Sequence, residues 1–340
     1  MEKITTKRQS NFELLRILCM LMIVAHHLAV HGSYPFTENA VINDYIIRFF
    51  TIGGKIGVNI FVLISGYFMV DSNFRIKKAV RLWAQMLFYS LLIFSLFLIF
   101  GKVQYSNGLL LNTIFPLSTN MWWFAGAYFI MYCLSPYINL VVKNCSKTMH
   151  LTLIAFLIVV QCFIQLIFKI SHLSNVAWFI TLYIIASYIK RYPHKIFDSN
   201  KIAIPVSIVA FLLIASLYVF LKVDFWNMTN IACLIWSVSV FCSFKNFNIK
   251  NSKIINSIAK TTFGVYLLHD HGLMRNFIWV ELLKCPLHYQ HKTFICFAIV
   301  AVLLVFVSCM IVDFIRELLF TAVSKTIGLI TSKRKQKQDG

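Results

Sequence analysis

The first strongly hydrophobic stretch of the chain carries four ionisable residues. The segment NFELLRILCMLMIVAHHLAVHG, residues 11–32, contains Glu13, Arg16, His26 and His27. Ionisable groups in hydrocarbon cost several kcal/mol or lose their charge, so they commonly face a protein interior. An imidazole suits general acid–base catalysis near neutral pH, and a guanidinium binds carboxylates and phosphates through a fork of donors.

Arg16 and His27 share one face of the helix that this segment predicts. An α-helix turns by about 100° per residue, so residues eleven positions apart point within about 20° of the same direction and lie about 16 Å apart along the helix axis. Glu13 lies one turn before Arg16, which predicts an i,i+3 ion pair, and His31 lies one turn after His27. His26 points about 100° away from this stripe. The charged groups either anchor the helix at the membrane interface or face a cavity, and a coherent stripe favours the cavity.

A second cluster of ionisable residues lies late in the chain. The segment TTFGVYLLHDHGLMR, residues 261–275, contains His269, Asp270, His271 and Arg275. An Asp270–Arg275 pair could serve packing alone, but intramembrane charges commonly mark function. We expect the two histidine-bearing helices to run parallel and to face one cavity.

Composition identifies the class of protein that must position these residues. The chain has 340 residues, of which 59% are hydrophobic, 16% aromatic and 13% charged, and its mean hydropathy is +0.75. Such a chain is typical of an all-α polytopic membrane protein with about ten transmembrane helices. The predicted spans are residues 12–31, 51–70, 79–101, 121–142, 150–169, 176–190, 202–221, 227–244, 261–281 and 293–313. The first is too long and too polar for a cleaved signal peptide, so we expect it to be retained.

The basic residues predict the orientation of these helices. The net charge is +20, and most of the 32 Lys and Arg residues fall in loops on the same side as both termini. Few, such as Lys55 and Lys102, are assigned to the opposite side. The positive-inside rule then makes both termini cytoplasmic. The basic charge is mainly this orientation signal, with attraction to anionic lipid as a secondary effect, and nucleic-acid binding is not needed to explain it.

The chain shows one membrane domain and no metal-binding pattern. We predict a cytoplasmic N-terminal segment (residues 1–11), a single transmembrane domain (residues 12–322) and a basic cytoplasmic tail (residues 323–340). The nine cysteines have no CxxC spacing and are expected to pack as small apolar residues, without a metal.

Several motifs occur in the order and spacing of a known family. Arg16 and His27 match an Arg/Lys-x10-His signature, and Lys78-Ala-Val-Arg81 stands where relatives often have Arg-x-x-Arg, with a departure at the first position. The chain resembles the acyltransferase-3 family, especially stand-alone polysaccharide O-acetyltransferases of bacteria. The remaining matches are in IGVNIFVLISGYFMV (Gly57, Val58, Phe61, Ser65, Gly66 and Tyr67), MWWFAGAYFIMYCLSPYIN, and TFGVYLLHDHGLMRNFIW (Thr262, Phe263, Gly264, Tyr266, Leu267 and His269).

The resemblance implies a multi-pass enzyme of the bacterial inner membrane. It would move acetyl from cytoplasmic acetyl-CoA to a hydroxyl of a capsule, exopolysaccharide or O-antigen glycan, or of its lipid-linked precursor. His27 would act as general base or carry the acyl group, with Arg16, His269 and Asp270 as further catalytic residues. The expected donor-binding residues are Arg16, Arg75, Lys78 and Arg81, and the expected substrate-binding residues are Glu13, Tyr67, Trp122, Trp123 and Arg275.

Other readings of these residues stay open. Ser65 could be a nucleophile, but a Ser-Gly pair in a membrane helix is more often a close-packing site. Trp122, Trp123, Trp178 and Trp279 could form a platform for sugar rings, although an interfacial belt is favoured. A transporter or flippase of a lipid-linked sugar could use the same His and Asp residues as a proton relay, and a structural or sensory protein could use them only for packing. The acyl group, the acceptor sugar and the oligomeric state stay undetermined.

Overall fold

Helices account for nearly all of the ordered structure, as the hydrophobic composition predicts. The computed structural model describes residues 8–36, 42–164, 167, 174–221 and 227–338. Of the described residues, 82% are helical and none lies in a strand. Lipid offers no partner to a backbone N–H or C=O, so spanning segments satisfy these groups internally as helices. Seven of the described helices are long and apolar enough to cross a membrane.

The helices follow one another with short connections. Their bounds are α1 Ser10–His31, α2 Ile42–Met69, α3 Ile76–Ile99, α4 Asn107–Ile114, α5 Trp123–Asn144, α6 Lys147–Ile158, η1 Val159–Ile164, α8 Asn175–Arg191, α9 Lys195–Asp198, α10 Asn200–Leu221, α11 Ile231–Lys245, α12 Lys253–His269, α13 Gly272–Asn276, η2 Phe277–Leu282, α14 Cys285–His288 and α15 Phe294–Gln338.

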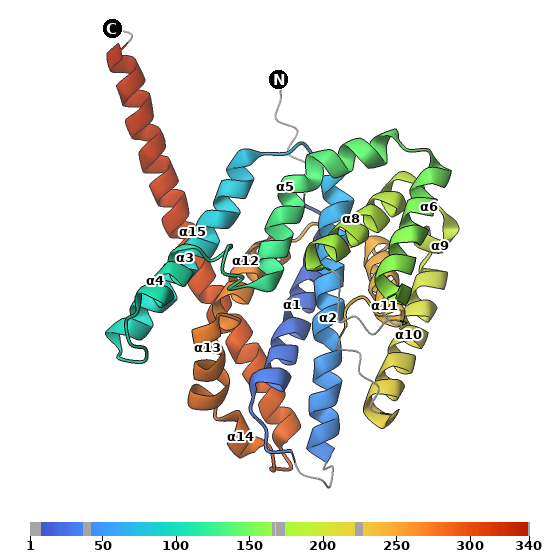
Figure 1. The fold of residues 1–340 in the computed structure, drawn as a ribbon, viewed down its shortest axis with the longest axis horizontal. Coiled ribbons are helices and arrows are strands. Elements are labelled where there is room, and N and C mark those ends of the chain that lie inside the picture. Colours follow the sequence, from blue (N-terminus) through green and yellow to red (C-terminus); the bar gives the residue numbers. More distant parts are fainter. Residues whose placement is uncertain (1–7, 37–41, 165–166, 168–173, 222–226, 339–340) are drawn as a thin grey trace.

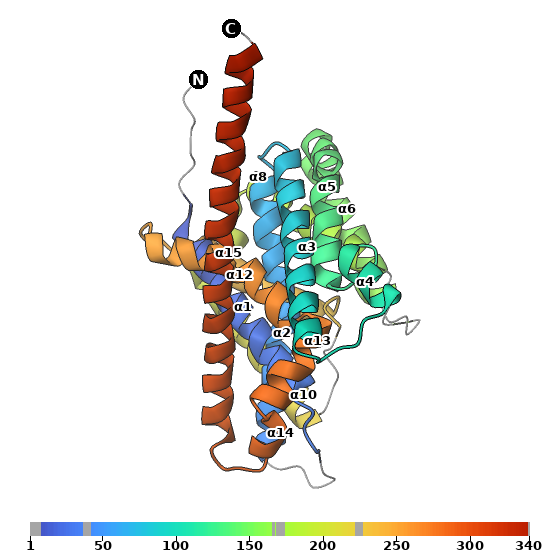
Figure 2. The same ribbon diagram turned by 90° about the vertical axis from the view of Figure 1, so that its left-hand side faces the viewer.

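Helices α1 and α2 lie side by side at the centre of the molecule (Figure 1). Helices α8, α10 and α11 lie on one side of this pair, and α12, α13 and α15 lie on the other. Helix α15 is the longest, and its C-terminal part extends well beyond the other helices (Figure 2). The site residues of α1 therefore lie in the interior of the helix bundle.

Glycine residues allow α1 and α2 to pack closely. A Cβ atom on Gly54 would lie 2.3 Å from Cγ of His26, and one on Gly57 would lie 2.9 Å from the carbonyl oxygen of Cys19. Small residues let membrane helices approach and gain van der Waals contact. Gly54 and Gly57 thus contribute to the close packing of α1 and α2.

Several predicted spans differ from the helices in their bounds, and α15, which continues to Gln338, is much longer than the predicted span 293–313. Two of the differences affect the site. Helix α2 begins at Ile42 rather than at residue 51, and Lys55, which was assigned to the outer side of the membrane, lies within this helix rather than in a loop. The predicted span 261–281 is interrupted, because α12 ends at His269 and α13 begins at Gly272. The Nδ1 atom of His271 accepts a hydrogen bond from the backbone N–H of Leu273 at 3.2 Å and so caps α13. Asp270 consequently lies at a helix break.

Three tryptophans are buried rather than placed in an interfacial belt. Trp122, Trp178 and Trp279 are each at most 1% exposed. The Nε1 atom of Trp178 donates to Oδ1 of Asn59 at 2.9 Å, and that of Trp122 donates to the carbonyl oxygen of Leu267 at 3.1 Å. An indole N–H needs an acceptor when it is buried, and the protein interior supplies one in both cases. The expectation of a belt is therefore wrong for these three residues.

A buried ion pair joins α15 to α3 and α12. The Nε atom of Arg316 donates to Oδ1 of Asp313 at 2.6 Å, and both side chains are almost fully buried. Gln85 and Tyr89 of α3 donate to the same carboxylate at 3.2 and 2.6 Å. A Cβ atom on Gly264 of α12 would lie 2.0 Å from Oδ1 of Asp313. The glycine at this position leaves room for the carboxylate.

Candidate active site

Two histidines from distant parts of the chain meet inside the molecule. The Nδ1 atom of His27 on α1 lies 2.8 Å from Nε2 of His269 at the end of α12. The Nδ1 atom of His269 in turn lies 2.6 Å from the carbonyl oxygen of Val265. Both histidines are buried. The structure therefore brings together the two histidine-bearing segments, as their sequence predicts.

This chain of hydrogen bonds determines where the protons lie when both rings are neutral. A carbonyl oxygen can only accept, so Nδ1 of His269 donates to Val265 and Nε2 of His269 is left as an acceptor. The Nδ1 atom of His27 must then donate to His269, which leaves the lone pair of His27 on Nε2. The arrangement selects the tautomer of His27 whose Nε2 can accept a proton.

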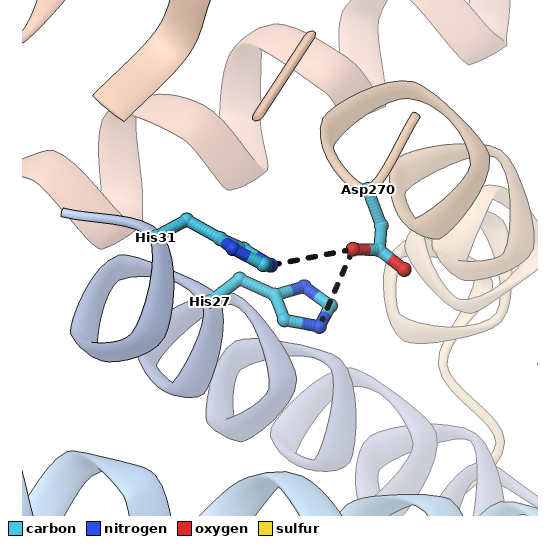
Figure 3. Close-up of side chains that lie close together, drawn as sticks. All are labelled: His27, His31 and Asp270. Atoms are coloured by element: carbon cyan, nitrogen blue, oxygen red, sulfur yellow. Dashed lines mark ion pairs between the residues drawn. The ribbon is translucent and has the colours of Figure 1, made fainter. Parts of the chain in front are cut away.

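Asp270 lies beside this basic nitrogen (Figure 3). Its Oδ1 atom is 3.5 Å from Nε2 of His27 and 3.8 Å from Nε2 of His31. The same oxygen accepts from Nε of Arg275 at 2.9 Å, which is the ion pair that the sequence predicts. A carboxylate next to an imidazole stabilises the imidazolium that forms when the ring takes up a proton.

His27, His31 and Asp270 also have the number and type of ligands that a metal ion would need. Their candidate ligand atoms all lie within 4.8 Å of one another. Two imidazoles and one carboxylate suit zinc in a catalytic site. However, Oδ1 of Asp270 is already occupied by Arg275, and a guanidinium at that oxygen opposes binding of a second cation. The donor set therefore fits an ion-pair network better than a metal centre.

A cavity of about 210 Å³, here called the histidine cavity, contains these groups. It is formed mainly by α1, α2, α5 and α12. The residues that line it are Met20, Ile23, His26, His27, Val30, His31, Gly54, Lys55, Val58, Trp123, Phe124, Tyr266, Asp270 and Arg275. A small molecule or one sugar hydroxyl group can therefore approach His27 from this side.

A second cavity, here called the basic cavity, lies next to the first turns of α1 and has a volume of about 400 Å³. Five cationic side chains line it, and no carboxylate is among its lining residues. These cations are Arg8, Arg16, Lys78, Arg81 and Lys260. Glu13 and Glu317 outside the cavity partly neutralise them, since Glu13 accepts from Arg16 at 3.0 Å and Glu317 from Arg81. The cavity suits a polyanion such as a phosphate-bearing ligand.

Met20 and Phe124 separate the two cavities. Both residues line the histidine cavity and the basic cavity alike. Their exposed fractions are only 2% and 7%, and this pair of buried side chains shared by the two cavities is here called the neck. Phe124 stacks against Tyr128 with ring centroids 5.9 Å apart. Met is unbranched and adaptable, so its side chain can move at low cost.

Several predicted residues lie outside both cavities. Tyr67 packs against Phe12 and Phe241, and Trp122 is buried behind His271. Arg75 is exposed, and its carbonyl oxygen accepts from Tyr132. Ser65, by contrast, lines the basic cavity, but its Oγ atom donates to the carbonyl oxygen of Phe61 in its own helix at 2.9 Å. The structure thus brings together the predicted residues Arg16, Lys78, Arg81, His27, Trp123, Asp270 and Arg275 at the two cavities, with Glu13 and His269 directly behind them.

Some cavity residues were not identified from the sequence. Lys55 falls between two packing glycines and a long apolar run, and a lysine inside a membrane helix is a signal that could have singled it out. Arg8 and Lys260 resemble ordinary topology determinants, and only the fold brings them beside Arg16. Met20 and Phe124 carry no signal that distinguishes them from other core residues.

The helical bundle and its buried site together define a multi-pass membrane protein with an imidazole–carboxylate centre. The sequence model of the acyltransferase-3 family, described as an acyltransferase domain, matches residues 9–314. The match spans most of the chain, which therefore belongs to the acyltransferase-3 family. Comparison with curated proteins and with solved structures gave no match.

Proposed function

We propose that this membrane acyltransferase moves an acetyl group from acetyl-CoA to a hydroxyl of a cell-surface glycan or of its lipid-linked precursor. The observation that carries this proposal is the basic nitrogen of His27, held beside Asp270 in a cavity that adjoins a cluster of five cations. A bacterial inner-membrane location, with both termini in the cytoplasm, would expose the basic cavity to cytoplasmic acetyl-CoA.

The donor occupies the basic cavity. Its phosphates contact Arg8, Arg16, Lys78, Arg81 and Lys260, and the pantetheine arm passes the neck toward His27. Arg16 and His27 are eleven residues apart on α1, about 16 Å along the axis, which is a distance that an extended arm has to cover. Binding of the phosphates far from the thioester positions the acyl carbon without contributing charge at the reacting atoms.

The acceptor hydroxyl enters the histidine cavity and reacts directly with the thioester. The Nε2 atom of His27 takes the hydroxyl proton while the oxygen forms a bond to the acyl carbon. The carbon–sulfur bond then breaks, and the sulfur leaves as a thiolate. The imidazolium returns the proton to that sulfur, which gives the ester, free CoA and neutral His27. Asp270 stabilises the imidazolium between these two steps.

The family resemblance and the site chemistry favour a sugar as the acceptor. Trp123 lines the histidine cavity together with Arg275 and Lys55. Aromatic rings together with polar side chains are suited to a pyranose ring and its hydroxyl groups. Glu13 acts at the other end of α1, where it holds Arg16 in place for the donor.

A reconstituted assay tests the proposal. The purified chain in nanodiscs is supplied with acetyl-labelled acetyl-CoA and a set of oligosaccharide acceptors, and ester-linked label on the glycan is measured. We expect label on the glycan with wild type and none with His27→Ala. Free CoA without labelled glycan would indicate the wrong acceptor set. Transport of a lipid-linked sugar without any use of acetyl-CoA would overturn the proposal.

A further inference from the structure

Helix α3 contributes one wall of the basic cavity, and this wall ends in an uncharged side chain. Lys78, Arg81, Leu82 and Gln85 all line the cavity and follow the i, i+3, i+4 and i+7 spacing of a single helix face. Gln85 lies one helical turn, about 6 Å, beyond Arg81. The wall therefore carries two cations first and an amide group farther along the same helix.

Asp313 holds the amide group of Gln85 in one orientation. The Nε2 atom of Gln85 donates to Oδ1 of Asp313 at 3.2 Å. A carboxylate that is paired with the buried Arg316 only accepts, so the nitrogen side of the amide faces Asp313. Tyr89 donates to the same oxygen at 2.6 Å. The amide cannot turn over without breaking a hydrogen bond to a buried carboxylate.

The oxygen of the same amide is left for a ligand. In the part of the chain that the structure describes, Oε1 of Gln85 accepts no hydrogen bond, yet this atom is not fully buried. The hydroxyl groups of Ser65 and Thr262 on the same cavity donate to backbone carbonyl oxygens. The five cationic side chains of the cavity are donors without an acceptor. Gln85 thus adds a hydrogen-bond acceptor to a cavity that otherwise presents mainly donors.

We propose that Oε1 of Gln85 accepts a hydrogen bond from an amide N–H group of the pantetheine arm of the donor. This inference rests on the proposed function and names a residue that binds the arm between the phosphates and the thioester. Helices α1 and α3 both run away from the end of the bundle where the N-terminus lies (Figure 1). Met20 of the neck follows Arg16 by one turn on α1, and Gln85 follows Arg81 by one turn on α3. An arm that leaves the phosphates for the neck therefore passes Gln85.

A cycle that changes the ligand and the protein in turn tests this contact. Binding of CoA to the chain in nanodiscs is measured by calorimetry, beside two analogues in which one or the other amide N–H of the arm is replaced by an ester oxygen. We expect wild type to bind at least one analogue about fivefold to tenfold more weakly than CoA, which is the effect of one hydrogen bond. Gln85→Met should bind the same analogue within about twofold of CoA.

Two further variants separate this contact from packing. Gln161 donates to Thr181 and lines neither cavity, so Gln161→Met removes a buried amide elsewhere and should keep the wild-type ratio. Gln85→Lys retains a donor for Asp313 but has no acceptor, and its charge acts alike on ligands that carry the same phosphates. It should lose the ratio as Gln85→Met does, and it replaces Gln85→Met if that variant does not purify as a monodisperse protein.

The outcomes separate this inference from the proposed function. A third analogue lacks the exocyclic amine of the adenine base, and a ratio that depends on Gln85 only for this analogue overturns the contact with the arm. Equal binding of CoA and its analogues by wild type, or ratios that Gln85→Met leaves unchanged, overturn the role of Gln85 but leave acyl transfer intact. Absence of CoA binding to wild type overturns the proposed function instead.

Discussion

Nε2 of His269 lies 2.8 Å from Nδ1 of His27, although the two residues are 242 positions apart in the sequence. Because His269 is itself held by the carbonyl oxygen of Val265, this contact fixes both the orientation and the tautomer of His27. It is the relationship on which the assignment of His27 as the base depends.

The first prediction concerns this contact. His27→Ala should abolish acyl transfer, and His269→Ala should lower kcat by about 10²-fold or more, because a general base contributes about 10²–10⁴-fold and needs the right tautomer. The measurement is ester-linked label on the glycan under saturating donor. His150 is a matched control, since it is buried and bound to the carbonyl oxygen of Ile184. A His269→Ala enzyme as active as His150→Gln would show that His269 does not hold the base.

The second prediction concerns binding of the donor. Lys260→Ala should raise the KM for acetyl-CoA about tenfold with little change in kcat, because Lys260 lines the cavity proposed for the phosphates and not the cavity of His27. Higher ionic strength should raise the wild-type KM in the same direction. Lys253 is exposed on the same helix and does not line the cavity, so Lys253→Ala is the control. Equal KM values for the two variants would remove Lys260 from the donor site.

The third prediction concerns the neck between the cavities. Met20→Trp should block the passage of the pantetheine arm while leaving the basic cavity open to the nucleotide part of CoA. We therefore expect loss of acyl transfer together with nearly normal binding of 3′-phosphoadenosine diphosphate, measured by calorimetry. Leu28 is buried on the same helix and lines neither cavity, so Leu28→Met serves as a mild packing control. Full transfer activity in Met20→Trp would place the path of the donor elsewhere.

The fourth prediction concerns the stability of the bundle. Asp313→Ala leaves Arg316 charged and buried, and should destabilise the protein by about 3–5 kcal/mol. Gly264→Ala should also destabilise it, because the new Cβ atom would collide with the Asp313 carboxylate. Thermal unfolding in detergent measures both effects. The double variant Asp313→Ala/Arg316→Met should be less destabilised than Asp313→Ala alone. A double variant that unfolds at a lower temperature than Asp313→Ala would contradict the role of the ion pair.

The fifth prediction concerns metal ions at His27, His31 and Asp270. Because Arg275 occupies Oδ1 of Asp270, treatment with a chelator should leave acyl transfer unchanged. Elemental analysis of the purified protein should find less than stoichiometric zinc. A loss of activity that added zinc restores would instead assign these three residues to a metal centre.

The stripe on α1 and the cluster near the end of α12 could both be identified without the fold. Helical periodicity alone places Arg16 and His27 on one face, and the Glu13–Arg16 and Asp270–Arg275 ion pairs join residues close in sequence. The break after His269 was not predicted, because the apolar character continues through α13 and η2 while the turn depends on the His271 cap. Hydropathy reports how long a segment is apolar, not whether its backbone stays helical.

The sequence by itself determined that this protein lies in lipid, that it is all-helical, and that one face of its first helix is polar. Hydropathy and helical periodicity are properties of neighbouring residues, so they can be found without the fold. Only the tertiary structure decided that His269 orients His27, that Arg8 and Lys260 join Arg16, and that Lys55 lies in the histidine cavity. These contacts join residues far apart in the chain. They depend on how α1 packs between α2 and α12, and no short-range pattern encodes that packing.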